Sequence, residues 1–186
     1  MRIVEWAPVS FNGSLPSFGA AFESHLAEIG NGAAYRSSAS AWSLLYRVLE
    51  RCGLPVGTVA FGEHGKPFFS DADVFFSLSH AGDLVAVSVS DAPTGVDVER
   101  ADRKISSRIE EKCLCEREKQ AYDGDFIRLW CRKECIVKLT GEGIYGYPNK
   151  IDTGDGRYGF YETLLWYGGR PYRLTAAFSE TDAARL

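Results

Sequence analysis

The sequence has no long apolar run and no low-complexity tract, and we expect no secretory leader. It contains no stretch of about 20 apolar residues, the length that a membrane-spanning helix requires. The first thirty residues carry Glu5, Glu23 and Glu28 and have no uninterrupted apolar core of the kind found in signal peptides. Because 45% of the residues are apolar and 13% are aromatic, we expect a globular protein and no membrane partner.

The sequence also has no CxxC pair and no excess of basic residues, and these absences disfavour a disulfide framework, a zinc site and a nucleic-acid partner. The five cysteines form no CxxC pair and their number is odd, which disfavours a disulfide framework and predicts a reducing, cytoplasmic location. Zinc binding by Cys113, Cys115, Cys131 and Cys135 is disfavoured because CxC with CxxxC is not a usual zinc spacing. Basic residues number 21 against 25 acidic ones, and this net charge of −4 argues against a nucleic-acid partner.

One region reverses this charge balance. Between Arg100 and Lys138, 11 basic residues stand against 8 acidic ones, a local surplus of +3. Such a surplus can attract anionic partners. The alternative is an ordinary solvated helical surface.

The hydrophobic pattern predicts an α+β fold with two halves, residues 1–90 and 91–186, that share no sequence repeat. In the first half we expect a strand over 2–9, helices over 17–30 and 37–53, and a meander of strands over 56–61, 74–79 and 84–90. Ser37 or Ser38 is the expected cap of the second helix. In the second half we expect a strand at 95–99, helices over 105–114, 116–122 and 125–140, and a hairpin over 157–167 and 171–178.

The strand "GVDVE" at 95–99 carries the first candidate site. Side chains two apart on a strand share a face, so Asp97 and Glu99 converge while Val96 and Val98 face the core. Adjacent carboxylates repel each other, and a hard cation such as Mg²⁺ relieves that repulsion. The alternative is an edge strand with an acidic solvent face.

The helix expected at 130–138, "WCRKECIVK", carries the second candidate site. Trp130, Glu134 and Lys138 recur at intervals of four residues and share one face, with Lys133 at its margin. Glu134 can complete the metal site, although a Glu–Lys pair at this spacing also serves simply to stabilise a helix. Anion contacts are suggested by Lys66, Ser79 and His80, which lie in loops or at strand ends.

Taken in order, "GKP", "FSLSH", "GVDVE" and "LWCRKECIVK" resemble the 4'-phosphopantetheinyl transferase superfamily, specifically its surfactin type. The resemblance extends from about Gly62 to Gly143. It implies two pseudo-symmetric α+β halves in one monomeric chain, with coenzyme A bound by the first half and the active site in the cleft between them. It also implies a Mg²⁺-dependent holo-acyl-carrier-protein synthase, which transfers phosphopantetheine from coenzyme A to a serine of an acyl or peptidyl carrier protein and releases adenosine 3',5'-bisphosphate.

The resemblance assigns roles by position. Asp97, Glu99 and Glu134 would hold Mg²⁺, Glu134 or a water that it orients would take the serine proton, and Lys138 with Lys133 would face the departing phosphate. The residues expected to contact coenzyme A are Arg36, Lys66, Ser79, His80 and Lys138. Among Arg36, Arg47 and Arg51 we favour Arg36 as the 3'-phosphate clamp, because it is expected just before a helix N-terminus.

The remaining expectations concern the partner and the alternatives. Glu118 matches a family glutamate near the metal, and Trp130 is expected to be structural. Ile105, Ile109 and Leu114 either contact the carrier or belong to the core. The alternatives are another Mg²⁺-dependent phosphoester or pyrophosphate enzyme, and a degenerate non-catalytic relative that binds a carrier or a nucleotide.

Overall fold

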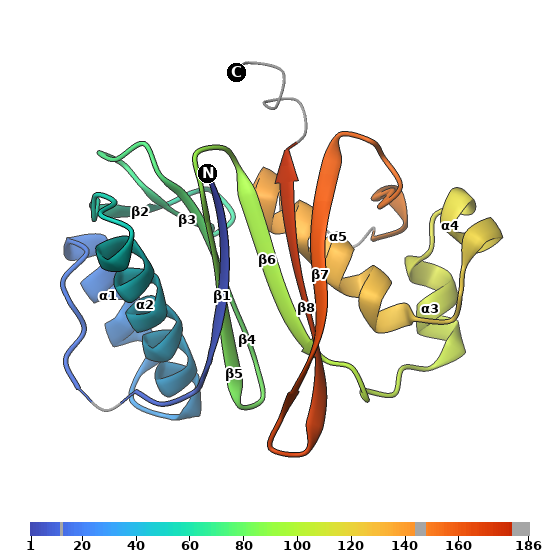
Figure 1. Cartoon of the computed structure of the whole chain (residues 1–186), viewed down its shortest axis with the longest axis horizontal. Coiled ribbons are helices and arrows are strands. Elements are labelled where there is room, and N and C mark those ends of the chain that lie inside the picture. The colour runs from blue at the N-terminus through green and yellow to red at the C-terminus, as the bar shows by residue number, and fades with distance from the viewer. Residues whose placement is uncertain (12, 144–147, 180–186) are drawn as a thin grey trace.

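The computed structural model describes residues 1–11, 13–143 and 148–179, which form an α+β fold as predicted (Figure 1). These described residues form eight strands and five α-helices. In chain order the elements are β1 (Arg2–Pro8), α1 (Ala20–Ile29), α2 (Ala33–Arg51), β2 (Val59–Phe61), β3 (Pro67–Phe69), β4 (Phe75–Ala81), β5 (Leu84–Ser90), β6 (Thr94–Arg100), α3 (Ser107–Cys113), α4 (Glu116–Ala121), α5 (Phe126–Thr140), the short 3-10 helix η1 (Pro148–Lys150), β7 (Tyr158–Tyr167) and β8 (Arg170–Ser179).

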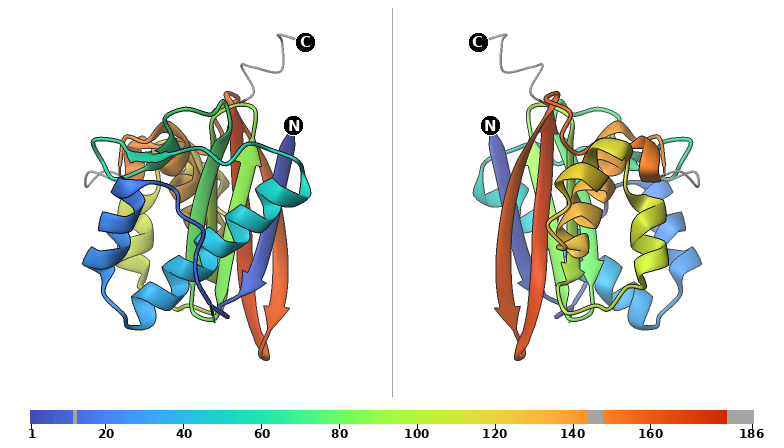
Figure 2. Two further views of the ribbon diagram at one scale, coloured as in Figure 1. Left: turned by 90° about the vertical axis from the view of Figure 1, so that its left-hand side faces the viewer. Right: turned by 90° about the vertical axis from the view of Figure 1, so that its right-hand side faces the viewer.

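Two antiparallel three-stranded sheets have the same strand order. The first is β1-β5-β4 and the second is β6-β8-β7, so in each sheet the first strand in sequence pairs with the last. The helix α2 crosses in front of the first sheet when the molecule is viewed from its left side (Figure 2). On the second sheet α5 packs against Ala177 of β8 through Cys135 and Leu139. The division at residue 90 stays a prediction, with one such sheet on each side of it.

Strand β5 is buried on both faces. Its Val85, Val87 and Val89 join the core beneath α1 and α2, whereas Leu84 and Ala86 pack against the second sheet. This explains why residues 84–90 contain so few exposed positions, since a strand covered on both sides has no solvent face.

The two sheets meet where β4 lies beside β6. The Val96 N–H donates to Ser77 Oγ at 3.1 Å, and the Val98 N–H donates to Ser79 Oγ at 3.3 Å. These two hydroxyls accept from buried amides on the edge of β6 that does not face β8. A buried amide without an acceptor would cost free energy of folding. The SxS spacing on β4 matches the spacing of two amides on one edge of a strand.

Glycine at position 95 lets α5 approach β6 closely. A Cβ there would collide with the Cys135 carbonyl oxygen and lie 2.8 Å from Leu139 N. The close approach brings the helix that carries Glu134 and Lys138 down onto the strand that carries Asp97.

Most predicted elements are confirmed, including the strand at 95–99, the three helices after it and the final hairpin, but two details are wrong. Helix α2 begins at Ala33, earlier than predicted, and neither Ser37 nor Ser38 caps it, because both lie inside the helix. Arg36 therefore lies in its first turns and does not precede it. The short strand β3, with Pro67 at its start, was not predicted.

No described helix is long and apolar enough to span a bilayer.

Candidate functional site

Three predicted residues from β4, β6 and α5 meet at the seam between the sheets. Lys138 Nζ lies 2.8 Å from Asp97 Oδ1 and 2.9 Å from Ser79 Oγ, and it also donates to the Val96 carbonyl oxygen at 3.0 Å. Ser79 Oγ in turn donates to Asp97 Oδ1 at 2.9 Å. The tertiary fold thus joins positions 79, 97 and 138 into one hydrogen-bonded cluster.

The charges of this cluster shift the pKa values of its members. Burial lowers the pKa of Lys138, but the charge of Asp97 and the hydrogen bond to it outweigh burial, so the net pKa lies above its ordinary value. Lys138 is therefore a cation at neutral pH. Burial raises the pKa of Glu134, and the charges of Asp97 and Glu99 raise it further, whereas Lys138 lowers it. Glu134 thus feels the negative field of the two strand carboxylates.

The donor set fits a hard cation such as Mg²⁺. Asp97 is buried, and its Oδ2 has no hydrogen-bond partner among the described residues, which is an unusual state for a buried carboxylate oxygen. Glu99, on the same face of β6, pairs with Arg103 at 3.2 Å. Carboxylate oxygens are the ligands that Mg²⁺ prefers. The ligand oxygens of Asp97, Glu99 and Glu134 do not all lie within 4.8 Å of one another, so their shared metal site stays a prediction.

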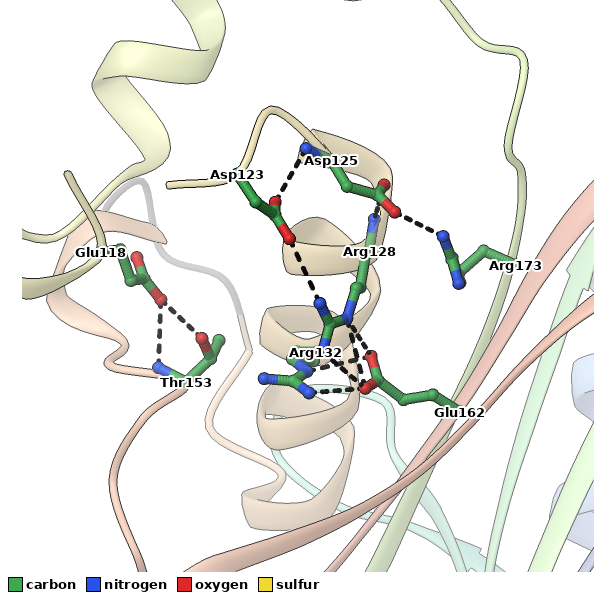
Figure 3. Close-up of polar contacts among 8 residues, drawn as sticks. All are labelled: Glu118, Asp123, Asp125, Arg128, Arg132, Thr153, Glu162 and Arg173. Atoms are coloured by element: carbon green, nitrogen blue, oxygen red, sulfur yellow. Dashed lines mark hydrogen bonds and ion pairs between the residues drawn. The ribbon is translucent and has the colours of Figure 1, made fainter. Parts of the chain in front are cut away.

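A different trio, Cys115, Glu118 and Asp152, does bring its ligand atoms within 4.8 Å of one another. Glu118 is already saturated there. It accepts from Thr153 N at 3.1 Å and from Thr153 Oγ1 at 2.8 Å (Figure 3). It also accepts from Cys115 N at 2.9 Å and pairs with Lys133 at 2.6 Å. Because the Lys133 ammonium already neutralises Glu118, this cluster is better explained as a structural joint than as a cation site.

Lys133 is fully buried and holds the chain that follows α5. In addition to Glu118, its ammonium donates to the carbonyl oxygens of Pro148, at 3.0 Å, and Ile151. One residue along a helix is a rotation of about 100°, so Lys133 and Glu134 face different neighbours. The structure thus gives no support to the expected contact of Lys133 with a phosphate, or to a place for Glu118 beside Asp97; both stay predictions.

Lys66 and His80, which are also expected to contact coenzyme A, each line a surface hollow. Lys66 donates to the Leu139 carbonyl oxygen at 2.8 Å, and it lines a hollow of about 460 Å³ with Pro67, Phe68, Thr140 and Gly141. Burial lowers the pKa of Lys66. His80 lines another hollow, of about 540 Å³, with Glu99, Arg100 and Arg103.

Burial, with the nearby charge of Lys138, lowers the pKa of His80, although Asp97 opposes the shift. Arg36 is exposed on α2, and within the described ranges no hydrogen bond or ion pair joins its guanidinium to either hollow.

A small apolar hollow lies beside the basic segment. It has a volume of about 90 Å³, and its lining residues are Arg103, Ile105, Ile109, Phe126, Ile127 and Trp130. Ile109 is 51% exposed, whereas Leu114 is 6% exposed and therefore belongs to the core. Trp130 stacks on Phe126 with ring centroids 6.1 Å apart.

Two features of the site were not predicted from the sequence. One is the pairing of Glu99 with Arg103, and the other is a set of ion pairs around Glu162 on the flank of α5 (Figure 3). The only local signal for the second was the spacing of Arg128 and Arg132, four residues apart on one side of the helix. Their acidic partner lies 30 residues or more away in sequence, which no local pattern reveals.

Comparison with known proteins gives consistent matches. Residues 93–179 match the family model of the 4'-phosphopantetheinyl transferase superfamily. The chain is 37% identical over 108 residues to 4'-phosphopantetheinyl transferase psf-1 of Bacillus pumilus, covering 52% of this chain and 46% of that protein. It is 30% identical over 122 residues to the transferase gsp of Aneurinibacillus migulanus, covering 60% and 51%. It is 36% identical over 106 residues to AcpT of Salmonella typhimurium, covering 50% and 55%. The matched part is about half the length of each of these relatives.

Proposed function

We propose that the chain belongs to the 4'-phosphopantetheinyl transferase superfamily, whose family model matches residues 93–179, and that it transfers 4'-phosphopantetheine from coenzyme A to a serine of an acyl or peptidyl carrier protein. The observation that carries the proposal is the cluster of Asp97, Lys138 and Ser79. It places a cation and a half-satisfied carboxylate at the seam between the two sheets, beside a glutamate of raised pKa.

In phosphoryl transfer the protein contributes mainly by positioning the reacting groups and by neutralising negative charge on the phosphate oxygens. The serine oxygen would form a bond to the β-phosphorus of coenzyme A, and the bond from that phosphorus to the oxygen bridging to the α-phosphate would break. Bound Mg²⁺ would neutralise charge on the pyrophosphate, with Asp97, Glu99 and Glu134 as the oxygen donors that hold it.

The proton of the serine hydroxyl would pass to Glu134 or to a water that Glu134 orients. The raised pKa of Glu134 makes it a stronger base than an ordinary carboxylate. Lys138 would stabilise the negative charge on the departing adenosine 3',5'-bisphosphate, since its raised pKa keeps it cationic.

The two hollows suggest how the nucleotide of coenzyme A would be held. Lys66 donates to the carbonyl oxygen of Leu139, the residue that follows Lys138 on α5. From this position Lys66 would contact a phosphate or the adenine nucleotide. Ser79 and His80 continue along β4 and would contact the same ligand. Arg36 remains our proposed clamp for the 3'-phosphate.

The carrier would approach the basic segment from Arg100 to Lys138. Carrier proteins are generally acidic, so the surplus of +3 favours the encounter. The hollow beside Ile105 and Ile109 would accept an apolar side chain of the carrier. We further propose that the protein acts as a monomer in the cytoplasm, without a nucleic-acid or membrane partner.

Intact-protein mass spectrometry of apo carrier proteins, incubated with this protein, coenzyme A and Mg²⁺, tests the proposal. We expect a gain of one phosphopantetheinyl group, abolished by EDTA and by Glu134→Gln. The matched control is Glu28→Gln, which changes an exposed side chain on α1, outside the basic segment, and should leave transfer intact.

Other outcomes would contradict the proposal. Consumption of coenzyme A without a carrier would indicate another Mg²⁺-dependent phosphoester enzyme. Binding of carrier and coenzyme A without transfer to any carrier in a broad panel would indicate a non-catalytic relative.

A further inference from the structure

Glu162 of β7 is the centre of an ion-pair network that attaches α5 to the second sheet (Figure 3). Its carboxylate accepts from Arg132 Nε at 3.0 Å and Nη2 at 2.5 Å, and from Arg128 Nε at 3.2 Å. The Glu162 side chain is only 18% exposed. One carboxylate thus binds two arginines on the same flank of the helix, a two-point attachment that restricts rotation about the helix axis.

A second attachment lies at the start of the same helix. Asp125 caps α5 by accepting from Arg128 N at 3.0 Å, and its other carboxylate oxygen pairs with Arg173 of β8. Asp123 joins the two attachments, because it accepts from Asp125 N at 3.0 Å and from Arg128 Nη1 at 3.3 Å (Figure 3). The N-terminal half of α5 is therefore attached to both β7 and β8.

Both attachments lie in the cross-strand rows of the proposed metal ligands. Glu162 is opposite Thr175, and Thr175 is opposite Asp97. Arg173 is directly opposite Glu99. Because directly opposite residues share a face of a sheet, the anchors of α5 and the carboxylates Asp97 and Glu99 lie on the same surface beneath the helix.

Packing and the ion-pair network together hold α5 on the second sheet. Gly95 lets the helix approach β6 closely, and Cys135 and Leu139 pack on Ala177 beside Phe160. Glu134 and Lys138 project from the same rigid helix as Arg128 and Arg132. A rotation that the network prevents would move Glu134 and Lys138 relative to Asp97.

We propose that Glu162 is a positioning residue for the transfer reaction: by holding Arg128 and Arg132 it sets the rotation of α5, and so the separation of Glu134 and Lys138 from Asp97 and Glu99. The inference rests on the proposed function, which includes the metal site of Asp97, Glu99 and Glu134. Its geometric consequence is measured separately from transfer, by the affinity of that carboxylate site for a divalent ion.

The experiment compares the parent protein with Glu162→Gln in two measurements. Binding of Mn²⁺, a paramagnetic substitute for Mg²⁺, is followed by electron paramagnetic resonance of the free ion, and we expect affinity to fall by about 10-fold. Transfer to a carrier is followed by steady-state kinetics, and we expect kcat to fall by about 10- to 100-fold with KM for coenzyme A near that of the parent. Circular dichroism at the assay temperature gives the folded fraction by which both results are corrected.

Asp155→Asn is the matched control, because it breaks the Arg157–Asp155 pair, which lies in the same half and makes no hydrogen bond or ion pair to α5 within the described part of the chain. If Glu162→Gln does not fold, Arg132→Lys replaces it: this change keeps the charge but loses the two-pronged bond, and it should shift both measurements in the same direction by less. Equal Mn²⁺ affinity and equal kcat in control and test variants would overturn the proposal. A parent that binds Mn²⁺ but transfers nothing would refute the proposed function, while the Mn²⁺ comparison would still decide the role of Glu162.

Discussion

The two sheets have the same strand order, yet their helices are held by different forces. Beneath α1 and α2 the first sheet has a large aromatic core, in which Trp42 lies 5.2 Å from Phe18, 4.9 Å from Phe22 and 5.6 Å from Phe76 between ring centroids. Beneath α5 the second sheet has a smaller apolar cluster, built on Cys135, Leu139 and Ala177, and ion pairs at Glu162 and Asp97. The first interface supplies stability by burying apolar surface, whereas the second holds charged groups at defined distances.

The largest effect on stability should come from the aromatic core. Trp42 is 2% exposed, and Trp42→Ala should lower the free energy of unfolding by about 3–5 kcal/mol, because it opens a cavity among the rings. Chemical denaturation followed by circular dichroism measures the loss. Any protein that remains folded should bind Mn²⁺ like the parent; a weakened site would show that the two interfaces are not separable in this way.

Lys138→Ala should act mainly on catalysis. We expect kcat to fall by about 10²- to 10³-fold, because the change removes the cation that we propose to face the leaving group. Steady-state transfer assays with saturating carrier measure this loss. The change also leaves the buried Asp97 carboxylate without its ion-pair partner and should destabilise the fold. The double variant Lys138→Met with Asp97→Asn removes both charges and should recover stability but no activity. Recovery of activity would exclude an electrostatic role for Lys138.

Gly95→Ala should affect both the stability of the fold and the carboxylate site beneath α5, though less strongly. The added Cβ would meet the backbone of α5, so the helix must move away from β6, at a cost of about 1–3 kcal/mol. Thermal unfolding measures the cost, and Mn²⁺ titration should show a weaker site as the helix moves. Gly156→Ala is a suitable control, because a Cβ there meets no atom within 4 Å.

The smallest predicted effect concerns the acid dependence of stability. Burial raises the pKa of Glu162, but the hydrogen bonds from Arg132 and Arg128 outweigh it, so the folded-state pKa lies below the ordinary value of 4.5. The carboxylate therefore contributes stability that is fully present above pH 4.5 and is lost as the pH falls through the folded-state pKa. Urea midpoints at pH 7 and pH 4 should differ more for the parent than for Glu162→Gln. An equal difference in both proteins would contradict the assignment.

Local patterns in the sequence were sufficient for many features of the fold and the site. Alternation in residues 95–99 predicted that Val96 and Val98 are buried, and the four-residue spacing placed Glu134 and Lys138 on one helix face. The end of α5 at Gly141, in the left-handed region, and the Gly168–Gly169 turn followed from the chemistry of glycine. The start of α2 was misplaced because serines at 37 and 38 resemble caps, whereas the helix extends back to Ala33 without a capping side chain.

The sequence by itself determined which residues could form a charged cluster, because periods of two and of 3.6 residues follow from backbone geometry alone. Only the tertiary structure decided their partners. The ion pairs that it forms join Lys138 to Asp97, Lys133 to Glu118, Arg103 to Glu99, and both Arg128 and Arg132 to Glu162. Apart from the Arg103–Glu99 pair, these contacts join residues 15 to 41 positions apart. A charged side chain pairs with whatever opposite charge the packing of distant strands and helices brings within reach, and local sequence carries no record of that distance.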